Sequence, residues 1–157
     1  MKALIKSFGY AFEGIFTALK NERNMRIHTV CMIYMYFFLF AFDFFEITRT
    51  ELAIIFIANG LVMGAELINT SIESAVNLYG EKHTEQGKIA KDCAAGAVLI
   101  FTIFSVLCGI AIMYQPLAFQ KLFAYFLDNP VSIVLFIISV IIFSIFIFFG
   151  FGKKENK

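Results

Sequence analysis

The chain has 157 residues, of which 60% are hydrophobic and only 16% charged, with 21 phenylalanines and no tryptophan. This composition is typical of an all-α integral membrane protein and excludes an ordinary soluble domain. The net charge is +1 and the basic residues are scattered, so we expect no nucleic-acid partner. The three cysteines have no paired spacing, which implies neither a disulfide framework nor a zinc site.

Residues 1–20 form an amphipathic segment of their own. Its apolar residues recur at spacings of three and four and share one helix face, with the charged residues elsewhere. They are Leu4, Ile5, Phe8, Phe12, Ile15, Phe16 and Leu19. The segment is too short and too charged to span a bilayer. We therefore expect a surface helix that lies in the cytoplasmic membrane interface.

Four apolar segments follow, at about residues 27–45, 52–76, 93–115 and 131–152. The last two are uncharged and long enough to cross roughly 30 Å of hydrocarbon. We expect four transmembrane helices, three in a core and one extra helix at the C-terminal end. Residues 116–130 are interpreted as a linker, which ends in the stop-and-cap sequence Asp128-Asn129-Pro130.

The distribution of lysine and arginine predicts the orientation in the membrane. The N-terminal stretch, the connection between the second and third segments, and the C-terminal tail are rich in these residues. The other two connections carry only Arg49 and Lys121. Because cytoplasmic loops are enriched in lysine and arginine, we expect both termini on the cytoplasmic side.

Four polar side chains follow one face of the second segment. Asn59, Glu66, Asn69 and Glu73 are spaced by seven, three and four residues, which places them on one side of a helix. Carboxylates are rare inside membranes and usually mark a substrate, ion or proton site. The alternative is a shorter span, in which Glu66 already lies among the lipid headgroups. The opposite face carries Gly60 and Gly64, a small-residue spacing that favours close helix packing.

Charged residues also gather at the cytoplasmic ends of the first and third segments, in Asn21-Glu22-Arg23-Asn24-Met25-Arg26 and in Lys91-Asp92. Magnesium is commonly held by one or two carboxylates together with substrate phosphates. A carboxylate beside such a site and within reach of the bilayer could take a proton from a membrane alcohol. Helix capping and anchoring to the headgroups are the alternative explanation for residues such as Glu22, Arg26 and Asp92.

Three strings resemble the prokaryotic diacylglycerol kinase family, whose members include the small undecaprenol kinases. They are GIFTALKNERNMRIH, ELINTSIESAVN and AKDCAAGAVL, and the resemblance covers about residues 1–115. It implies a lipid kinase domain over residues 1–115 that uses ATP and Mg²⁺ in the bacterial cytoplasmic membrane. It also implies a homotrimer whose active sites are shared between subunits, with residues 116–157 outside the domain.

The resemblance assigns roles to individual residues. Glu66 corresponds to the catalytic carboxylate that activates the lipid hydroxyl, and Glu22 and Glu73 to the pair that binds the metal. The expected ATP contacts are Tyr10, Glu22, Glu73, Glu81, His83, Lys91 and Asp92. The residues expected at the lipid substrate, or as support for the active site, are Asn24, Arg26, Glu66 and Asn69.

The chain departs from the family pattern in three places. Asn77 stands where the family often has aspartate, and the loop between His83 and Lys91 is one residue longer than expected. The segment 131–152 has no counterpart in the minimal members and contains no ionisable group. We therefore expect this segment to pack against the core or contact lipid, and to be dispensable for catalysis.

Two alternatives for the function remain open. Among lipid alcohols, the strings ERNMR and AAGA favour undecaprenol over diacylglycerol. A function of another class is a small oligomeric transporter that uses Glu66 to bind protons or a cationic substrate. The carboxylates and lysines gather on the cytoplasmic side and have no matching cluster on the other side, which favours the kinase.

Overall fold

The computed structural model describes residues 2–78 and 84–151. Within these residues it is built from helices without any strand, which confirms the expected all-α class. The helices are α1 (Lys2–Asn21), α2 (Arg23–Ala41), α3 (Arg49–Leu78), α4 (Glu85–Met113), α5 (Pro116–Asp128) and α6 (Pro130–Phe149). The expected surface helix of residues 1–20 corresponds to α1.

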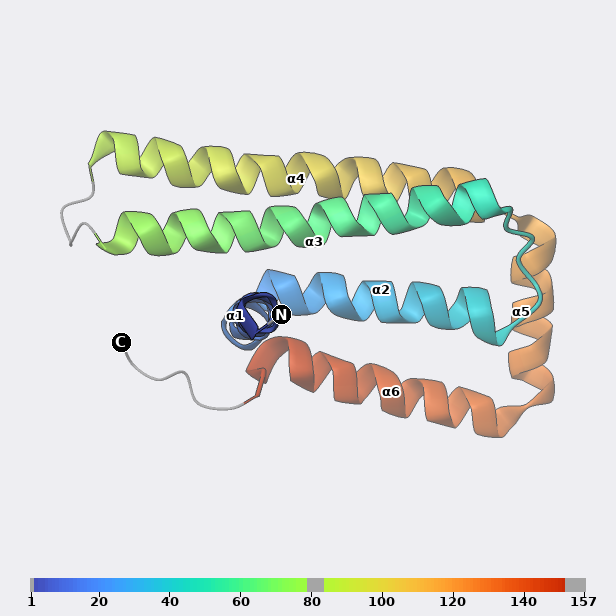
Figure 1. The fold of residues 1–157 in the computed structure, drawn as a ribbon. Helices are drawn as coiled ribbons and strands as arrows, with labels where there is room; N and C mark the ends of the chain where they lie inside the picture. Colours follow the sequence, from blue (N-terminus) through green and yellow to red (C-terminus); the bar gives the residue numbers. More distant parts are fainter. Residues whose placement is uncertain (1, 79–83, 152–157) are drawn as a thin grey trace.

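α2, α3, α4 and α6 run lengthwise beside one another, whereas α1 and α5 lie across them (Figure 1). α3 packs on α4 over the most extensive contact and also on α2, and α2 packs in turn on α6. α1 is seen end-on beside the start of α2, whereas α5 stands at the opposite end of the molecule (Figure 1). α1 therefore lies crosswise to the lengthwise helices, as a helix in the membrane interface would. Its apolar residues Leu4, Ile5, Phe8 and Phe12 are all more than half exposed.

By length and composition, α3, α4 and α6 are candidate membrane spans among the described residues. α2, expected as a span over residues 27–45, is not among them. It has 19 residues, and its first turns carry Arg23, Arg26 and His28, which lower its hydropathy. The helix also begins and ends about four residues earlier than expected. α2 nevertheless lies alongside the candidate spans α3 and α6 (Figure 1). That it also spans the membrane stays a prediction.

α3 and α4 are longer than the apolar segments that predicted them. They contain 30 and 29 residues. At about 1.5 Å per residue each is roughly 45 Å long, which exceeds a hydrocarbon core of roughly 30 Å. Figure 1 shows the end of α3 and the start of α4 extending past α1. Lys91 and Asp92 were expected just before the third span, but they lie within α4.

Capping residues set these helix ends. At the start of α3, Thr48 and Glu51 form a reciprocal pair: the Thr48 amide donates to Glu51 Oε2 at 2.8 Å, and the Glu51 amide donates to Thr48 Oγ1 at 3.2 Å. This capping box satisfies amides that have no partner inside the helix. At the start of α4, Thr84 Oγ1 accepts from the Gly87 amide at 3.0 Å. The cap at Thr84 explains why α4 starts eight residues before its uncharged stretch.

The expected linker over residues 116–130 is mostly the helix α5. Pro116 occupies the first turn, where a missing amide hydrogen costs nothing. Leu117, Phe123 and Leu127 are exposed on this helix, whereas Ala118 is buried. α5 thus turns the chain across the end of the bundle, and α6 then returns it to the end where α1 lies (Figure 1).

Candidate active site

The polar face of α3 is turned toward α2 at the level of Glu66. Glu66 is one of two buried charged side chains among the described residues, with only 2% of its surface exposed. Its Oε1 lies 3.3 Å from Nε2 of His28 on α2. Deeper in the bundle, Asn59 Nδ2 donates a hydrogen bond to the Tyr36 hydroxyl at 2.9 Å. α3 continues twelve residues beyond Glu66 to Leu78, so the helix does not end there, and the alternative of a shorter span with Glu66 among the headgroups stays a prediction.

Glu66 is buried without its full set of hydrogen bonds. His28 is within ion-pair distance, yet Glu66 Oε1 accepts no well-aligned hydrogen bond from any described residue. One turn away, Asn69 Oδ1 is also buried without a partner. Buried polar atoms are nearly always paired, and an unpaired acceptor is costly. Both atoms therefore indicate donors that arrive with a ligand, and a hydroxyl beside Glu66 is the simplest such donor.

A lateral groove leads away from this pair. It has a volume of about 340 Å³ and lies between α2, α3 and α4. His28 and Met63 line it near Glu66, and Asn59, Ser105 and Gly109 line it deeper in the bundle. α2 and α4 do not pack on each other, so the groove stays open between them. Its lining is mainly apolar, which suits a hydrocarbon chain.

Asn69 and Glu73 form the next part of the site, one turn further along α3. Asn69 Nδ2 donates to Glu73 Oε1 at 3.0 Å, which fixes the Glu73 carboxylate toward the Asn69 side chain. The remaining Glu73 oxygen and the unpaired Asn69 Oδ1 are hard oxygen donors, the type that Mg²⁺ prefers. These two residues therefore fit a magnesium ion that is shared with substrate phosphates.

Glu22 is the single non-helical residue between α1 and α2. Its backbone is extended, with φ −100° and ψ 120°, and its side chain makes no capping hydrogen bond to α2. The helix-cap explanation for Glu22 is therefore wrong. The backbone ladder nevertheless continues through this corner, because the Glu22 amide donates to Ala18 O at 2.8 Å and the Arg26 amide donates to Glu22 O at 3.3 Å.

Lys91 lies across from the end of α3. Its Nζ donates a hydrogen bond to Asn77 Oδ1 at 2.7 Å, which joins α4 to α3 beyond the level of Glu73. Asn77 is neutral, so this bond orients the ammonium group without neutralising its charge. Lys91 is therefore suited to bind a phosphate. Asp92, the next residue, is exposed on α4.

Replacing Lys91 with methionine should raise the KM for ATP by about tenfold, because a hydrogen bond to a charged group contributes about 1.5–3 kcal/mol. kcat at saturating ATP should change much less, because the methionine stem keeps the packing. Steady-state kinetics with varied ATP would measure both constants. Lys88→Met is the matched control, since Lys88 is an exposed cation one turn away on α4. An equal rise in KM for both variants would argue for a general charge effect.

The other expected site residues lie at the level of α1 or outside the described residues. Tyr10 is 61% exposed on α1, and Lys6 Nζ lies 5.7 Å from its ring centroid. Asn24 is exposed in the first turn of α2. Arg26 is buried and bonded to backbone carbonyls, which fits the supporting role among those expected for it. Glu81 and His83 fall outside the described residues, so their expected contacts stay predictions.

His28 is the site residue that the sequence analysis missed. Two histidines are too few for a histidine metal site. A single imidazole can nevertheless be the partner of a buried carboxylate, as His28 is for Glu66. The signal was available, because His28 ends the string GIFTALKNERNMRIH and follows Arg26 by two residues. Its pairing with Glu66 could be found only by placing α2 against α3.

Residues 9–113 match the family model described as prokaryotic diacylglycerol kinase. The chain belongs to this family. The matched segment runs from α1 to the end of α4, and α5 and α6 lie beyond it. The expected membership of the prokaryotic diacylglycerol kinase family is thus confirmed, and the transporter alternative gains no support.

Named relatives of this kinase family include both lipid specificities. The chain is 39% identical over 115 residues to a diacylglycerol kinase of Synechocystis, covering 73% of this chain and 64% of that protein. It is 36% identical over 119 residues to an undecaprenol kinase of Bacillus subtilis, covering 74% of this chain and 93% of that protein. A diacylglycerol kinase of Haemophilus influenzae is 29% identical over 118 residues. These relatives agree on a lipid kinase and differ in the lipid.

Proposed function

We propose that this protein transfers the γ-phosphoryl group of ATP to the hydroxyl of a membrane lipid, with Glu66 as the general base. The observation that carries this proposal is the buried Glu66 carboxylate, whose Oε1 lies beside His28 and lacks a hydrogen-bond donor. A lipid hydroxyl would supply that donor. As the hydroxyl oxygen attacks the γ-phosphorus, its proton passes to Glu66, and ADP leaves.

The groove between α2 and α4 provides the path for the lipid. Its lining continues from His28 and Met63 toward Asn59 and Gly109, which lie toward the start of α3 and the end of α4. A lipid chain in this groove would place its hydroxyl at the level of Glu66. A terminal alcohol on a long hydrocarbon chain therefore suits the site better than a water-soluble substrate.

The nucleotide side is formed by the part of α3 and α4 that extends past α1. Glu73 and Asn69 on α3, together with Glu22 at the corner of α1 and α2, would hold Mg²⁺ with the ATP phosphates. Bound there, Mg²⁺ neutralises charge on the β- and γ-phosphates. Lys91 would contact a phosphate from α4. Because ATP is cytoplasmic, we place this end and both termini on the cytoplasmic side of the bacterial membrane.

His28 would keep the Glu66 carboxylate in position and stabilise its charge before proton transfer. His28→Gln should lower kcat by about tenfold or more, the usual effect of removing a partner that orients a catalytic group. Glutamine retains a donor but places it differently from the imidazole, so kcat should fall while the KM for ATP stays near the wild-type value.

The matched control is Tyr36→Phe, which removes another hydrogen bond between α2 and α3 without touching Glu66. This control should keep the wild-type kcat. A His28→Gln enzyme with the wild-type kcat, or one in which only the KM for ATP changes, would contradict the role of His28.

We favour undecaprenol as the lipid and diacylglycerol as the alternative. The preference rests on the strings ERNMR and AAGA, since the named relatives include both enzymes. The test is a radiolabelled ATP assay in mixed micelles that offers each lipid alone and both together. A higher kcat/KM for undecaprenol is expected. Faster labelling of diacylglycerol would reverse the assignment, and labelling of neither lipid would contradict the proposed function.

We also propose that the enzyme is a homotrimer with shared active sites. Gly60 and Gly64 line a groove of about 450 Å³ on α3 and α4, and a Cβ at either glycine would meet no atom within 4 Å. Such a small-residue face suits a helix of a neighbouring subunit. Light scattering of the detergent-solubilised protein tests this, because a fully active monomer would contradict it.

A further inference from the structure

Arg26 joins three helices through backbone carbonyls. Its side chain is 5% exposed, and it is the second buried charged residue among those described. Nε donates to Ile147 O on α6 at 3.0 Å, and Nη1 donates to Lys20 O at 2.8 Å and to Leu19 O at 3.3 Å on α1. Arg26 itself lies in the first turns of α2. One guanidinium therefore connects α1, α2 and α6, and we call this set of bonds the Arg26 clamp.

The acceptors all belong to helix C-termini. α1 ends at Asn21 and α6 at Phe149, so Lys20 and Ile147 lie in the last turns of their helices. The final carbonyls of a helix have no partner within it, and they carry the negative end of the helix dipole. A guanidinium is a suitable cap because it presents several donors in a fixed plane and is always charged. Arg26 thus satisfies two helix ends at once.

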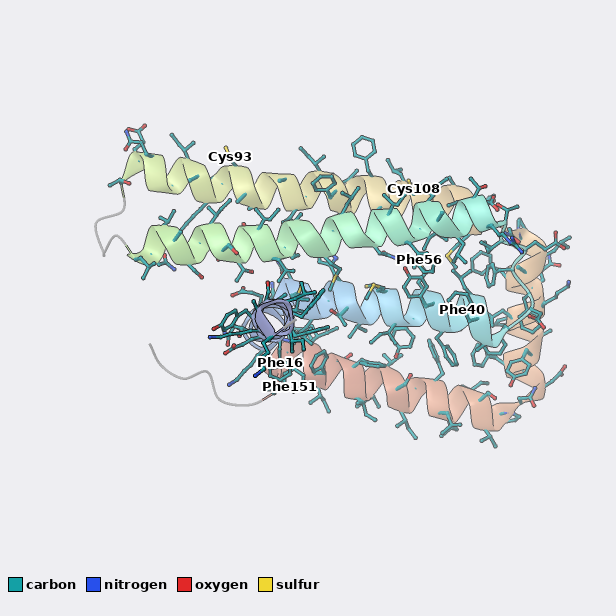
Figure 2. All side chains as sticks on the ribbon, in the orientation of Figure 1. Phe16, Phe40, Phe56, Cys93, Cys108 and Phe151 are labelled. Carbon is teal, nitrogen blue, oxygen red and sulfur yellow. The ribbon has the colours of Figure 1, made fainter. Side chains whose placement is uncertain are left out.

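The end of α6 is shaped to this arrangement. Gly150 follows the helix with φ +62° and ψ −145°, a conformation that side chains rarely adopt. A Cβ at this position would lie 3.1 Å from Arg26 Nη1 and 3.3 Å from Lys20 O. The next residue, Phe151, packs against Phe16 of α1 with the rings tilted and their centroids 5.4 Å apart (Figure 2). Gly150 and Phe151 therefore lie against the C-terminal part of α1 and Arg26 of α2.

Glu22 lies at the corner between α1 and α2, as the single non-helical residue between them. Because the two helices cross each other, the position of Glu22 depends on the angle between them. The Arg26 clamp fixes this angle, because it holds the last carbonyls of α1 against the first turns of α2. α6 supplies the third attachment point. Without Ile147 O, the Nε of the buried Arg26 side chain would have no acceptor.

We propose that α6 is a positioning element for Glu22, acting through the Arg26 clamp on the binding of Mg-ATP. This inference rests on the proposed function. α6 lies outside the segment that matches the family, so the device belongs to this chain's own C-terminal extension. If α6 positions Glu22, residues 131–152 are not dispensable for catalysis, contrary to the expectation from sequence. The reason is that the end of α6 contacts the corner where Glu22 lies.

Gly150→Ala tests the clamp without removing a charge or a helix, and Gly14→Ala is the matched control because a Cβ at Gly14 meets nothing within 4 Å. Two readouts are needed. The first is the rate of tryptic cleavage after Lys20 and Arg23, which are both exposed at the corner. The second is the Mg²⁺ concentration that gives half-maximal lipid phosphorylation. Gly150→Ala should raise both values by about fivefold, which corresponds to the lower end of the strain expected for one residue. Gly14→Ala should change neither, and kcat at saturating Mg²⁺ should be kept.

A double-mutant cycle separates the clamp from simple loss of packing. Arg26→Gln should raise the Mg²⁺ requirement further than Gly150→Ala, and the double variant should match Arg26→Gln alone, because both changes break the same set of contacts. Additive effects would overturn the proposal. So would a faster tryptic cleavage in Gly150→Ala with an unchanged Mg²⁺ requirement. If cleavage follows the expected pattern but the wild-type protein phosphorylates no lipid, the proposed function fails while the clamp between the helices stands.

Discussion

Glu66→Gln should abolish lipid phosphorylation while the protein still folds and binds nucleotide. Glutamine has nearly the same shape as glutamate and can still contact His28, but it cannot accept the proton of the lipid hydroxyl. A general base contributes about a hundredfold or more to the rate, so kcat should fall by at least about a hundredfold. Single-turnover phosphorylation with radiolabelled ATP would measure the chemical step directly.

The controls for this variant follow from its burial. Removing a buried charge could alter stability, so thermal unfolding and ATP binding by equilibrium dialysis should be compared with the wild type. Glu46→Gln is the matched substitution, because Glu46 is exposed in the connection at the opposite end of the bundle (Figure 1). Turnover near the wild-type rate in folded Glu66→Gln protein would remove Glu66 from the mechanism and reopen the assignment of the base.

The surroundings of Glu66 suit the role proposed for it, because a buried acceptor without a hydrogen-bond partner is open to the hydroxyl of an incoming lipid. Glu66 Oε1 has only the approach of His28, and it is shielded from solvent. Its neighbour Asn69 presents a second unpaired acceptor toward the same region. In the proposed mechanism, one of these acceptors would receive the lipid hydroxyl and the other would contact the metal ion or its bound water.

The sequence predicted the faces of α1 and α3 well, because periodicity depends only on helix geometry. The stripe from Asn59 to Glu73 did share one face, and the surface helix ended within one residue of the prediction. Periodicity does not say which neighbour a face meets. The contact of Glu66 with His28 therefore had to come from the packing of α2 on α3.

Helix boundaries were predicted less well, because hydropathy locates the hydrocarbon and not the ends of a helix. α4 begins at Glu85, where Thr84 caps it, although the uncharged stretch begins at Cys93. In the same way, α5 has only 13 residues and lies between two long apolar segments, so hydropathy alone does not separate it from a linker. Local capping and proline placement carried the missing information.

Arg26 shows a different limit of sequence reasoning. A basic residue at the cytoplasmic end of a span is well explained as an anchor to the headgroups. Its bond to Ile147 O joins residues 121 positions apart, and the acceptor is a backbone carbonyl that carries no sequence signal. Only Gly150 could have hinted at it, as a glycine that follows an apolar helix.

The carboxylates proposed to bind Mg²⁺, Glu73 and Glu22, give the second large effect. Glu73→Gln should raise the Mg²⁺ concentration for half-maximal activity by about tenfold or more, since even indirect changes around a metal cost 10–100-fold in affinity. Glu22→Gln should act in the same direction, because each substitution removes one hard, charged oxygen donor. Titration of purified variants with Mg²⁺ at saturating ATP and lipid would give these values, and Glu13→Gln, exposed on α1, is the control.

The two carboxylates can be told apart by how they depend on α6. Glu73 is held by Asn69 on its own helix, so its contribution should be insensitive to Gly150→Ala. Glu22 is positioned by the corner that Arg26 holds, so Glu22→Gln and Gly150→Ala should be non-additive in the Mg²⁺ requirement. If neither carboxylate variant alters the Mg²⁺ dependence, the ion is held by the phosphates and by other residues. A change in Glu73→Gln alone would confine the metal to α3 and leave Glu22 a role only in the geometry of the corner.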